Sequence, residues 1–125
     1  PLDQIHPQAR KAAEAAHCAG ETGKYWAMHD LLFQNQQALA PLQLTGHARE
    51  LGVDMTQFDE CLSSGRHAAR ITRGVTDGAA IGVQGTPSFV VGKTKVGDVV
   101  EGTLIRGAQP LETFLRAIEQ TLSQQ

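Results

Sequence analysis

Two cysteines and five histidines are the residues in this sequence best suited to nucleophilic or metal chemistry. Cys18 and Cys61 lie far apart, in neither a Cys-x-x-Cys redox pair nor a zinc-ligand spacing. The histidines form no HxxxH or HExxH pattern; they are His6, His17, His29, His47 and His67. We therefore expect no metal and no cofactor in this chain.

A Gly-Thr-Pro segment, Gly85 to Pro87, joins a helical run to a short β-branched and aromatic strand. Proline fixes φ and lacks an N–H, so it suits the first residue of a strand rather than its middle. It also pushes the preceding residue, Thr86, toward extended geometry. The pattern predicts that a helix ends near Gly82 and a strand begins at Ser88. On local sequence alone, the segment is an ordinary loop with a trans proline.

Length and composition predict one soluble globular domain with a real core. The chain has 125 residues, 41% hydrophobic and 19% charged, with a net charge of −2. The absence of a basic excess argues against a nucleic-acid partner. No apolar run is long enough to cross a membrane, and residues 1–7 have neither the basic start nor the apolar stretch of a signal peptide.

Residues 7–82 read as an all-helical block of about five helices. Alanine is abundant over residues 8–19, which favours a helix that Gly20 ends in the C′ position. A second helix is expected over residues 22–39. Its aromatic side chains are expected in an interhelical core: Tyr25, Trp26 and Phe33.

The second half of this block carries clear helix boundaries. A short helix is closed by Gly52, and Asp54 with Gln57 forms a capping-box pattern that starts the next helix. A longer helix then runs to Gly82. Four of its side chains are expected to face inward: Ala68, Ile71, Val75 and Ala79.

The remaining residues change to strands. Residues 88–91 and 99–105 are predicted as a hairpin around a turn at 92–98, followed by an amphipathic helix from Pro110. The apolar face of that helix is Leu111, Phe114, Leu115, Ile118 and Leu122. A two-stranded hairpin is marginal alone, and the first strand has the composition of a strand buried on both faces. We therefore expect a neighbouring strand that this sequence does not contain.

Five segments in order resemble the DsbA-like thioredoxin-fold oxidoreductases, most closely the branch of exported bacterial enzymes. They cover essentially the whole chain. They are His6-Pro7 with the alanine-rich helix, residues 24–33 (KYWAMHDLLF), residues 58–62 (FDECL), residues 82–89 (GVQGTPSF) and residues 107–111 (GAQPL).

The resemblance implies an α/β thioredoxin-like fold of the DsbA type with a helical insertion. Residues 1–125 would be one partial domain, with the insertion at 7–82 and the C-terminal half of the thioredoxin fold at 83–125. The first β-α-β unit, which carries Cys-x-x-Cys in the family, is lacking in this chain. Pro87 would be the family's cis proline, and Gly85, Thr86 and Pro87 would bind an extended substrate peptide by strand addition.

The function implied by the resemblance is thiol–disulfide oxidoreductase, a protein disulfide oxidase or isomerase. Its substrates would be thiol-containing proteins or peptides, with a membrane redox partner, in the periplasm or otherwise exported. Disulfide exchange needs an attacking thiolate and a resolving thiol. Because Cys-x-x-Cys is missing, we expect a C-terminal part of such an enzyme, with no catalytic residues of its own and inactive as written.

Two alternatives stay open, so the sequence does not decide whether the chain is an enzyme. One is a non-catalytic peptide-binding module that keeps the cis-proline loop. The other is a glutathione-dependent DsbA-fold transferase or isomerase with serine in place of the first cysteine. All three hypotheses share the fold.

The two cysteines also have two interpretations. They are separate buried thiols that act as small hydrophobes, or a structural Cys18–Cys61 disulfide that joins the first predicted helix to the fourth. The even count, an exported location and cysteine pairs at corresponding places in related proteins favour the disulfide. Finally, the exposed hairpin edge is expected to make the fragment dimerise or swap elements.

Overall fold

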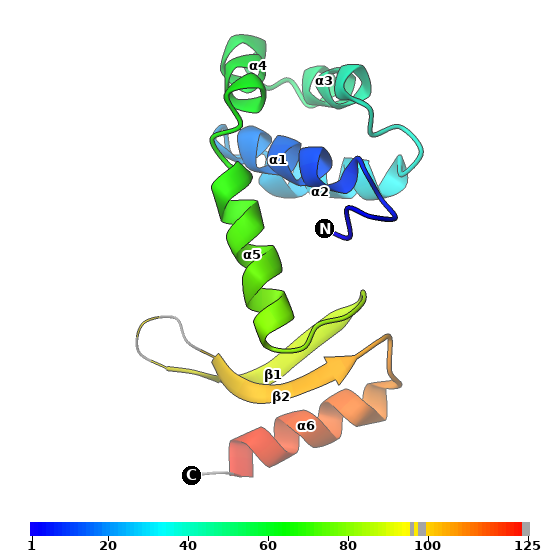
Figure 1. The fold of residues 1–125 in the computed structure, drawn as a ribbon, viewed down its shortest axis with the longest axis vertical. Helices are drawn as coiled ribbons and strands as arrows, with labels where there is room; N and C mark the ends of the chain where they lie inside the picture. Colours follow the sequence, from blue (N-terminus) through cyan, green and yellow to red (C-terminus); the bar gives the residue numbers. More distant parts are fainter. Residues whose placement is uncertain (96, 98–99, 124–125) are drawn as a thin grey trace. The chain divides into compact units, whose positions relative to one another are not determined.

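The structure is a computed structural model that describes residues 1–95, 97 and 100–123. The described chain forms two compact units, residues 1–76 and residues 77–125, which we call the helical unit and the hairpin unit. The division falls inside helix α5 (Ala68–Ala80), before Gly82, where the sequence placed the end of the helical block. Figure 1 shows the elements of each unit.

The helical unit is organised around α1 (Ala9–Gly20). This helix contacts α2 (Tyr25–Gln34), α3 (Pro41–Glu50) and α4 (Met55–Ser64), and Figure 1 shows α1 and α2 side by side. Four alanines of α1 are buried, and their small side chains allow close approach by the neighbouring helices. The largest fully buried side chains of the unit are Met28, Leu44, Phe58 and Cys61.

The end of α3 before Gly52 and the start of α4 after Asp54 follow the predicted signals, whereas the start of α3 was not predicted. Pro41 is the first residue of α3, and the Ala40 N–H donates to Gln43 Oε1 at 2.9 Å. Asp54 caps α4, because its Oδ1 accepts from the Gln57 N–H at 2.9 Å. This bond is one half of the predicted capping box; the return bond from the Gln57 side chain is absent among the described residues.

The end of α1 differs from the prediction, which placed the stop at Gly20. Gly20 is helical, and the left-handed residue is Gly23, with φ of 77°. The Gly23 N–H donates to Gly20 O and the Lys24 N–H donates to Ala19 O, both at 3.0 Å. These two bonds form a Schellman motif, which satisfies the last carbonyls of the helix and favours glycine at position 23 because φ is positive there.

The aromatic residues of α2 correct a second prediction. The helix ends at Gln34 rather than near residue 39, and it buries Met28 and Leu32. Trp26 and Phe33 are 70% and 64% exposed, so the predicted interhelical core was wrong for them. The reason is geometric: residues 28 and 32 share one helix face, and that narrow face fills the space against the alanines of α1.

The hairpin unit contains β1 (Ser88–Thr94) and β2 (Val100–Arg106), which pair antiparallel from Ser88↔Arg106 to Thr94↔Val100. Strand β1 is longer than predicted and takes in three residues assigned to the turn, Gly92, Lys93 and Thr94. Gly92 faces Gly102 in this register, and a Cβ on either would collide with the opposite backbone. The predicted start of the second strand at residue 99 lies outside the described residues.

The last helix, α6 (Leu111–Ser123), packs on β1. The contact includes an edge-to-face pair of Phe89 and Phe114, with ring centroids 5.0 Å apart. The rest of its predicted apolar face is largely uncovered: Leu111 is 73% exposed and Leu122 is 66% exposed. Among the described residues, no helix has the length and apolar character needed to cross a membrane.

Candidate functional site

The first candidate site is the loop that enters β1. The peptide bond between Thr86 and Pro87 is cis, and both residues are exposed. The Ser88 hydroxyl donates to Gly85 O at 2.6 Å, and the Gly107 N–H donates to Pro87 O at 2.8 Å. Within the described part of the chain, neither the N–H nor the C=O of Thr86 has a hydrogen-bond partner. These two groups are therefore free to pair with an extended peptide backbone.

A cation lies next to this loop. Arg106 pairs with Ser88 in the hairpin register, and its Nη2 donates to Gly82 O at 3.3 Å. Its side chain is exposed, so the guanidinium remains open to an anionic group of a bound peptide. The loop can thus offer backbone pairing and one positive charge.

The second candidate site contains the two cysteines. Of the two interpretations of the cysteines, the structure contains the disulfide. Cys18 and Cys61 are bonded, with a Cα–Cα distance of 5.7 Å, and they join α1 to α4. They are 3% and 1% exposed. Neither cysteine carries a free thiol, so neither is available in this state as the attacking thiolate of disulfide exchange.

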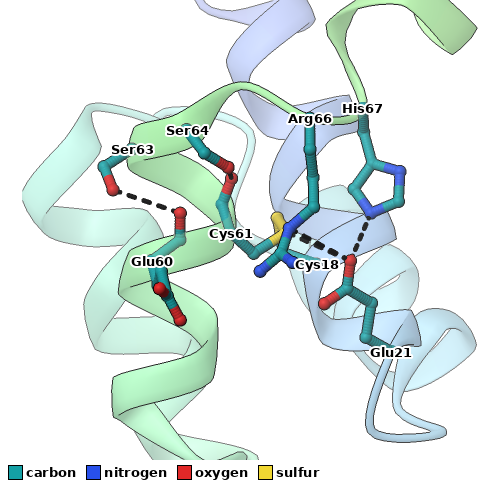
Figure 2. Close-up of polar contacts among 8 residues, drawn as sticks. All are labelled: Cys18, Glu21, Glu60, Cys61, Ser63, Ser64, Arg66 and His67. Carbon is teal, nitrogen blue, oxygen red and sulfur yellow. Dashed lines mark hydrogen bonds and ion pairs between the residues drawn. A yellow bond between two sulfur atoms is a disulfide. The ribbon is translucent and has the colours of Figure 1, made fainter.

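Polar side chains gather around this disulfide, as Figure 2 shows. His67 Nε2 donates to Glu21 Oε1 at 2.8 Å, and Arg66 Nε lies 3.4 Å from the same oxygen. That oxygen also contacts Cys61 Sγ at 3.5 Å. We call Cys18, Glu21, Cys61, Arg66 and His67 the disulfide cluster. It combines two sulfurs, a carboxylate, an imidazole and a guanidinium in one place.

His17 borders the disulfide cluster. Its ring stacks on the His67 ring, with centroids 5.3 Å apart. Burial lowers the pKa of His17 below its ordinary value, and the charges of Arg70 and His67 lower it further. His17 is therefore held in its neutral form over a wider pH range than a free histidine.

The sequence predicted a binding loop at Gly85, Thr86 and Pro87, which stays a prediction, and offered the cysteine pairing as one alternative, but it did not indicate the partners of the disulfide. Glu21, Arg66 and His67 come from the loops that follow α1 and α4, and no spacing rule links them. It also missed an apolar hollow of about 570 Å³ in the helical unit. The hollow is lined by residues that include Ala13, Tyr25, His29 and Phe33. The helical period of the aromatic residues of α2 was the sequence signal that could have indicated this hollow.

Comparisons with known proteins agree with the resemblance. The family model "DSBA-like thioredoxin domain" matches residues 1–119. The chain is 45% identical over 91 residues to "Na(+)/H(+) antiporter NhaA 1" of Salinispora arenicola (strain CNS-205), a match that covers 73% of this chain and 14% of the relative. It is 32% identical over 114 residues to "Na(+)/H(+) antiporter NhaA" of Herminiimonas arsenicoxydans, covering 91% of this chain and 17% of the relative.

The chain thus spans about a sixth or less of the length of these two curated relatives. No solved structure is significantly similar to it. The family match and the mixture of helices with a small sheet establish an α/β thioredoxin-like fold with a helical insertion, which is the fold of thiol–disulfide oxidoreductases. The chain belongs to the family of DSBA-like thioredoxin domains.

Proposed function

We propose that this chain is the substrate-docking part of a thiol–disulfide oxidoreductase that acts on thiol-containing proteins or peptides. The observation that carries the proposal is the exposed loop before β1, where the N–H and C=O of Thr86 are unpaired within the described chain. Family membership supports the same function, because the DSBA-like match includes this loop.

Docking follows from the backbone of the loop. An extended peptide that lies antiparallel to Thr86 can accept from its N–H and donate to its C=O, which is a short form of strand addition. Gly85 has no side chain, so the peptide backbone can approach closely. Main-chain pairing is insensitive to the side chains of the bound peptide, which suits a protein with many substrates.

The redox step requires a second component. A thiolate attacks one sulfur of a disulfide, a new S–S bond forms, the other sulfur leaves as a thiolate, and a resolving thiol then completes the exchange. Both cysteines of this chain are already bonded to each other. We propose that a Cys-x-x-Cys segment outside residues 1–125 supplies the reacting thiols and that the chain supplies the docking loop.

A backbone test separates docking at this loop from binding elsewhere. Thr86→Pro removes the N–H, whereas Thr86→Val keeps the N–H and the β-branched shape. We expect an alkylated cysteine-containing peptide to shift the amide resonances of Gly85, Thr86 and Ser88 in the parent and in Thr86→Val. Thr86→Pro should weaken binding by roughly tenfold, the equivalent of about 1.4 kcal/mol for one lost hydrogen bond. Equal binding by the two variants would contradict the proposal.

A second measurement tests the division of roles. The 125-residue chain should not catalyse insulin reduction by dithiothreitol, because its two cysteines are buried and form no Cys-x-x-Cys pair. Insulin-reducing activity that persists in the double variant Cys18→Ser/Cys61→Ser would refute this division. The two alternatives give other results: peptide docking by a full-length protein without redox activity marks a binding module, and competition by reduced glutathione marks a glutathione-dependent enzyme.

The relatives suggest where the domain works. They carry the printed name Na(+)/H(+) antiporter, and the region similar to this chain is a small part of each. We therefore propose that the domain operates on the exported side of a membrane, in company with an ion antiporter as its membrane partner. The Cys18–Cys61 disulfide supports an oxidising compartment.

An antibody against the chain tests this location. It should detect the native protein in the membrane fraction, accessible to protease added outside the cytoplasmic membrane. Co-purification with the antiporter, as one polypeptide or as a complex, is expected. Detection only in the cytosol would contradict both the exported location and the antiporter partner.

The hairpin unit also leaves a surface for self-association. Its sheet has two strands in the described part of the chain, and Leu111 and Leu122 of α6 are mostly exposed. We infer that residues 1–125 alone dimerise or swap elements through this unit. A monomer at high concentration, measured by size-exclusion chromatography with light scattering, would overturn this inference.

A further inference from the structure

We propose that the disulfide cluster becomes a zinc site when the Cys18–Cys61 bond is reduced. The ligands are the two thiolates, the His67 imidazole and the Glu21 carboxylate. The spacing of the four residues along the chain predicts no metal site, because they are dispersed. The structure brings them together in one place, shown in Figure 2.

The donor set is the first argument. The ligand atoms of Cys18, Cys61 and His67 all lie within 4.8 Å of one another. Glu21 Oε1 is 2.8 Å from His67 Nε2 and 3.5 Å from Cys61 Sγ, which makes it a fourth donor at the same point. Two thiolates, one imidazole and one carboxylate are ligands that zinc accepts in a tetrahedral arrangement.

The positions of the ligands along the chain are the second argument. Cys18 and Glu21 lie at the end of α1, one turn apart, whereas Cys61 lies in the last turn of α4 and His67 in the loop that follows it. Zinc sites are commonly built from two such pairs, each carried by one short segment. The Cα atoms of the cysteines are 5.7 Å apart, so separation of the sulfurs requires side-chain rotation rather than movement of the helices.

Access and charge are the third argument. The cysteines are buried, whereas the side chains of His67 and Glu21 are 21% and 33% exposed, so an ion can enter from their side. Zinc with two thiolates and one carboxylate carries a net charge of −1. Arg66 Nε lies 3.4 Å from Glu21 Oε1 and balances that charge from outside the ligand shell.

Reduction of the disulfide precedes zinc binding. A dithiol reductant donates two electrons and two protons to the Cys18–Cys61 disulfide, which becomes two thiols while the reductant becomes a disulfide. Zn²⁺ then displaces the two thiol protons and forms two Zn–S bonds. His67 binds through an unprotonated ring nitrogen, so the proton that it donates to Glu21 is released to solvent or carried by the other ring nitrogen. The same residues thus fasten α1 to α4 in both redox states, by a covalent bond or by a metal.

The experiment uses the 125-residue chain reduced with a phosphine, cleared of metal and titrated with Co²⁺ under nitrogen. We expect one Co²⁺ per chain, with the intense visible bands and sulfur-to-cobalt charge transfer of a tetrahedral thiolate site, bleached by Zn²⁺. The oxidised chain should show none of these bands. If reduction unfolds the chain, Zn²⁺ should restore its helical circular dichroism, because metal binding and folding are coupled.

Matched variants locate the ligands. His67→Ala and Glu21→Gln should each weaken Co²⁺ binding by roughly tenfold or more. His47→Ala is the control, since His47 is also half-buried in the helical unit but contacts Ala38 O instead. A reduced chain that binds no Co²⁺ and is not refolded by Zn²⁺ would overturn the proposal. So would equal affinities of His67→Ala and His47→Ala.

Discussion

The helical unit and the hairpin unit bury their apolar side chains to very different extents. Among the described residues, every buried hydrophobic side chain lies in the helical unit except Ile105. Helix α1 contacts three other helices and is bonded to one of them through Cys18. Helix α6, in contrast, has no buried residue. The comparison shows that the helical unit closes a core of its own, whereas the hairpin unit leaves apolar side chains exposed.

The largest expected effect comes from the disulfide, which only the helical unit has. Cys18→Ala/Cys61→Ala should lower the free energy of unfolding by about 4 kcal/mol, the value for a loop of this length in the chain-entropy model. Urea unfolding with a metal chelator present measures the loss. The double variant should not respond to reductant, unlike the parent. An unchanged free energy of unfolding would mean that α1 and α4 are held together by packing alone.

One matched substitution in each unit tests the difference in burial directly. Leu44 is 0% exposed and Leu115 is 44% exposed. Leu44→Ala should cost about 2–5 kcal/mol, because it leaves a cavity, and Leu115→Ala should cost less than about 1 kcal/mol. Both are measured by urea unfolding at a concentration where the chain is monomeric. Equal losses would show that α6 is covered in solution.

The start of α4 provides a smaller effect within the helical unit. Asp54→Ala removes the oxygen that accepts from the Gln57 N–H and should cost about 1 kcal/mol. The matched control is Asp59→Ala, an exposed position inside the same helix, which should change stability by no more than about 0.5 kcal/mol. If Asp54→Ala left the free energy of unfolding unchanged, the start of α4 would be stabilised by packing rather than by its cap.

The smallest expected effect is a pH dependence located at His17. Burial, Arg70 and His67 lower its pKa in the folded chain, so the unfolded chain binds the proton more tightly. The oxidised chain should therefore lose stability as pH falls through the unfolded pKa of about 6.5 toward the lower folded value. His17→Gln should flatten this slope, and Arg70→Gln should reduce it in part. Urea-unfolding midpoints across this pH range measure the slope of stability against pH. An unchanged slope in His17→Gln would mean that other groups cause the pH dependence.

Much of the fold was predictable because its signals are local. Pro41 and Asp54 mark the starts of two helices through backbone groups within one turn, and the period of Leu44 and Ala48 marks a buried face. The Gly-Thr-Pro segment marks the entry to β1 for the same reason. The predictions were wrong where burial of a side chain depends on a neighbouring helix. Trp26 and Phe33 are exposed because the alanine face of α1 accommodates only one narrow face of α2.

Local sequence was enough to predict the helical character of the insertion, the family and the turn at Gly85, Thr86 and Pro87, because propensity, caps and a characteristic order of segments act over short distances. Tertiary contacts were needed to join Cys18 to Cys61 and to bring Glu21 and His67 beside their disulfide. Those contacts join the ends of α1 and α4, and no local rule connects residues so far apart along the chain. They depend on how the alanine face of α1 lets α4 approach.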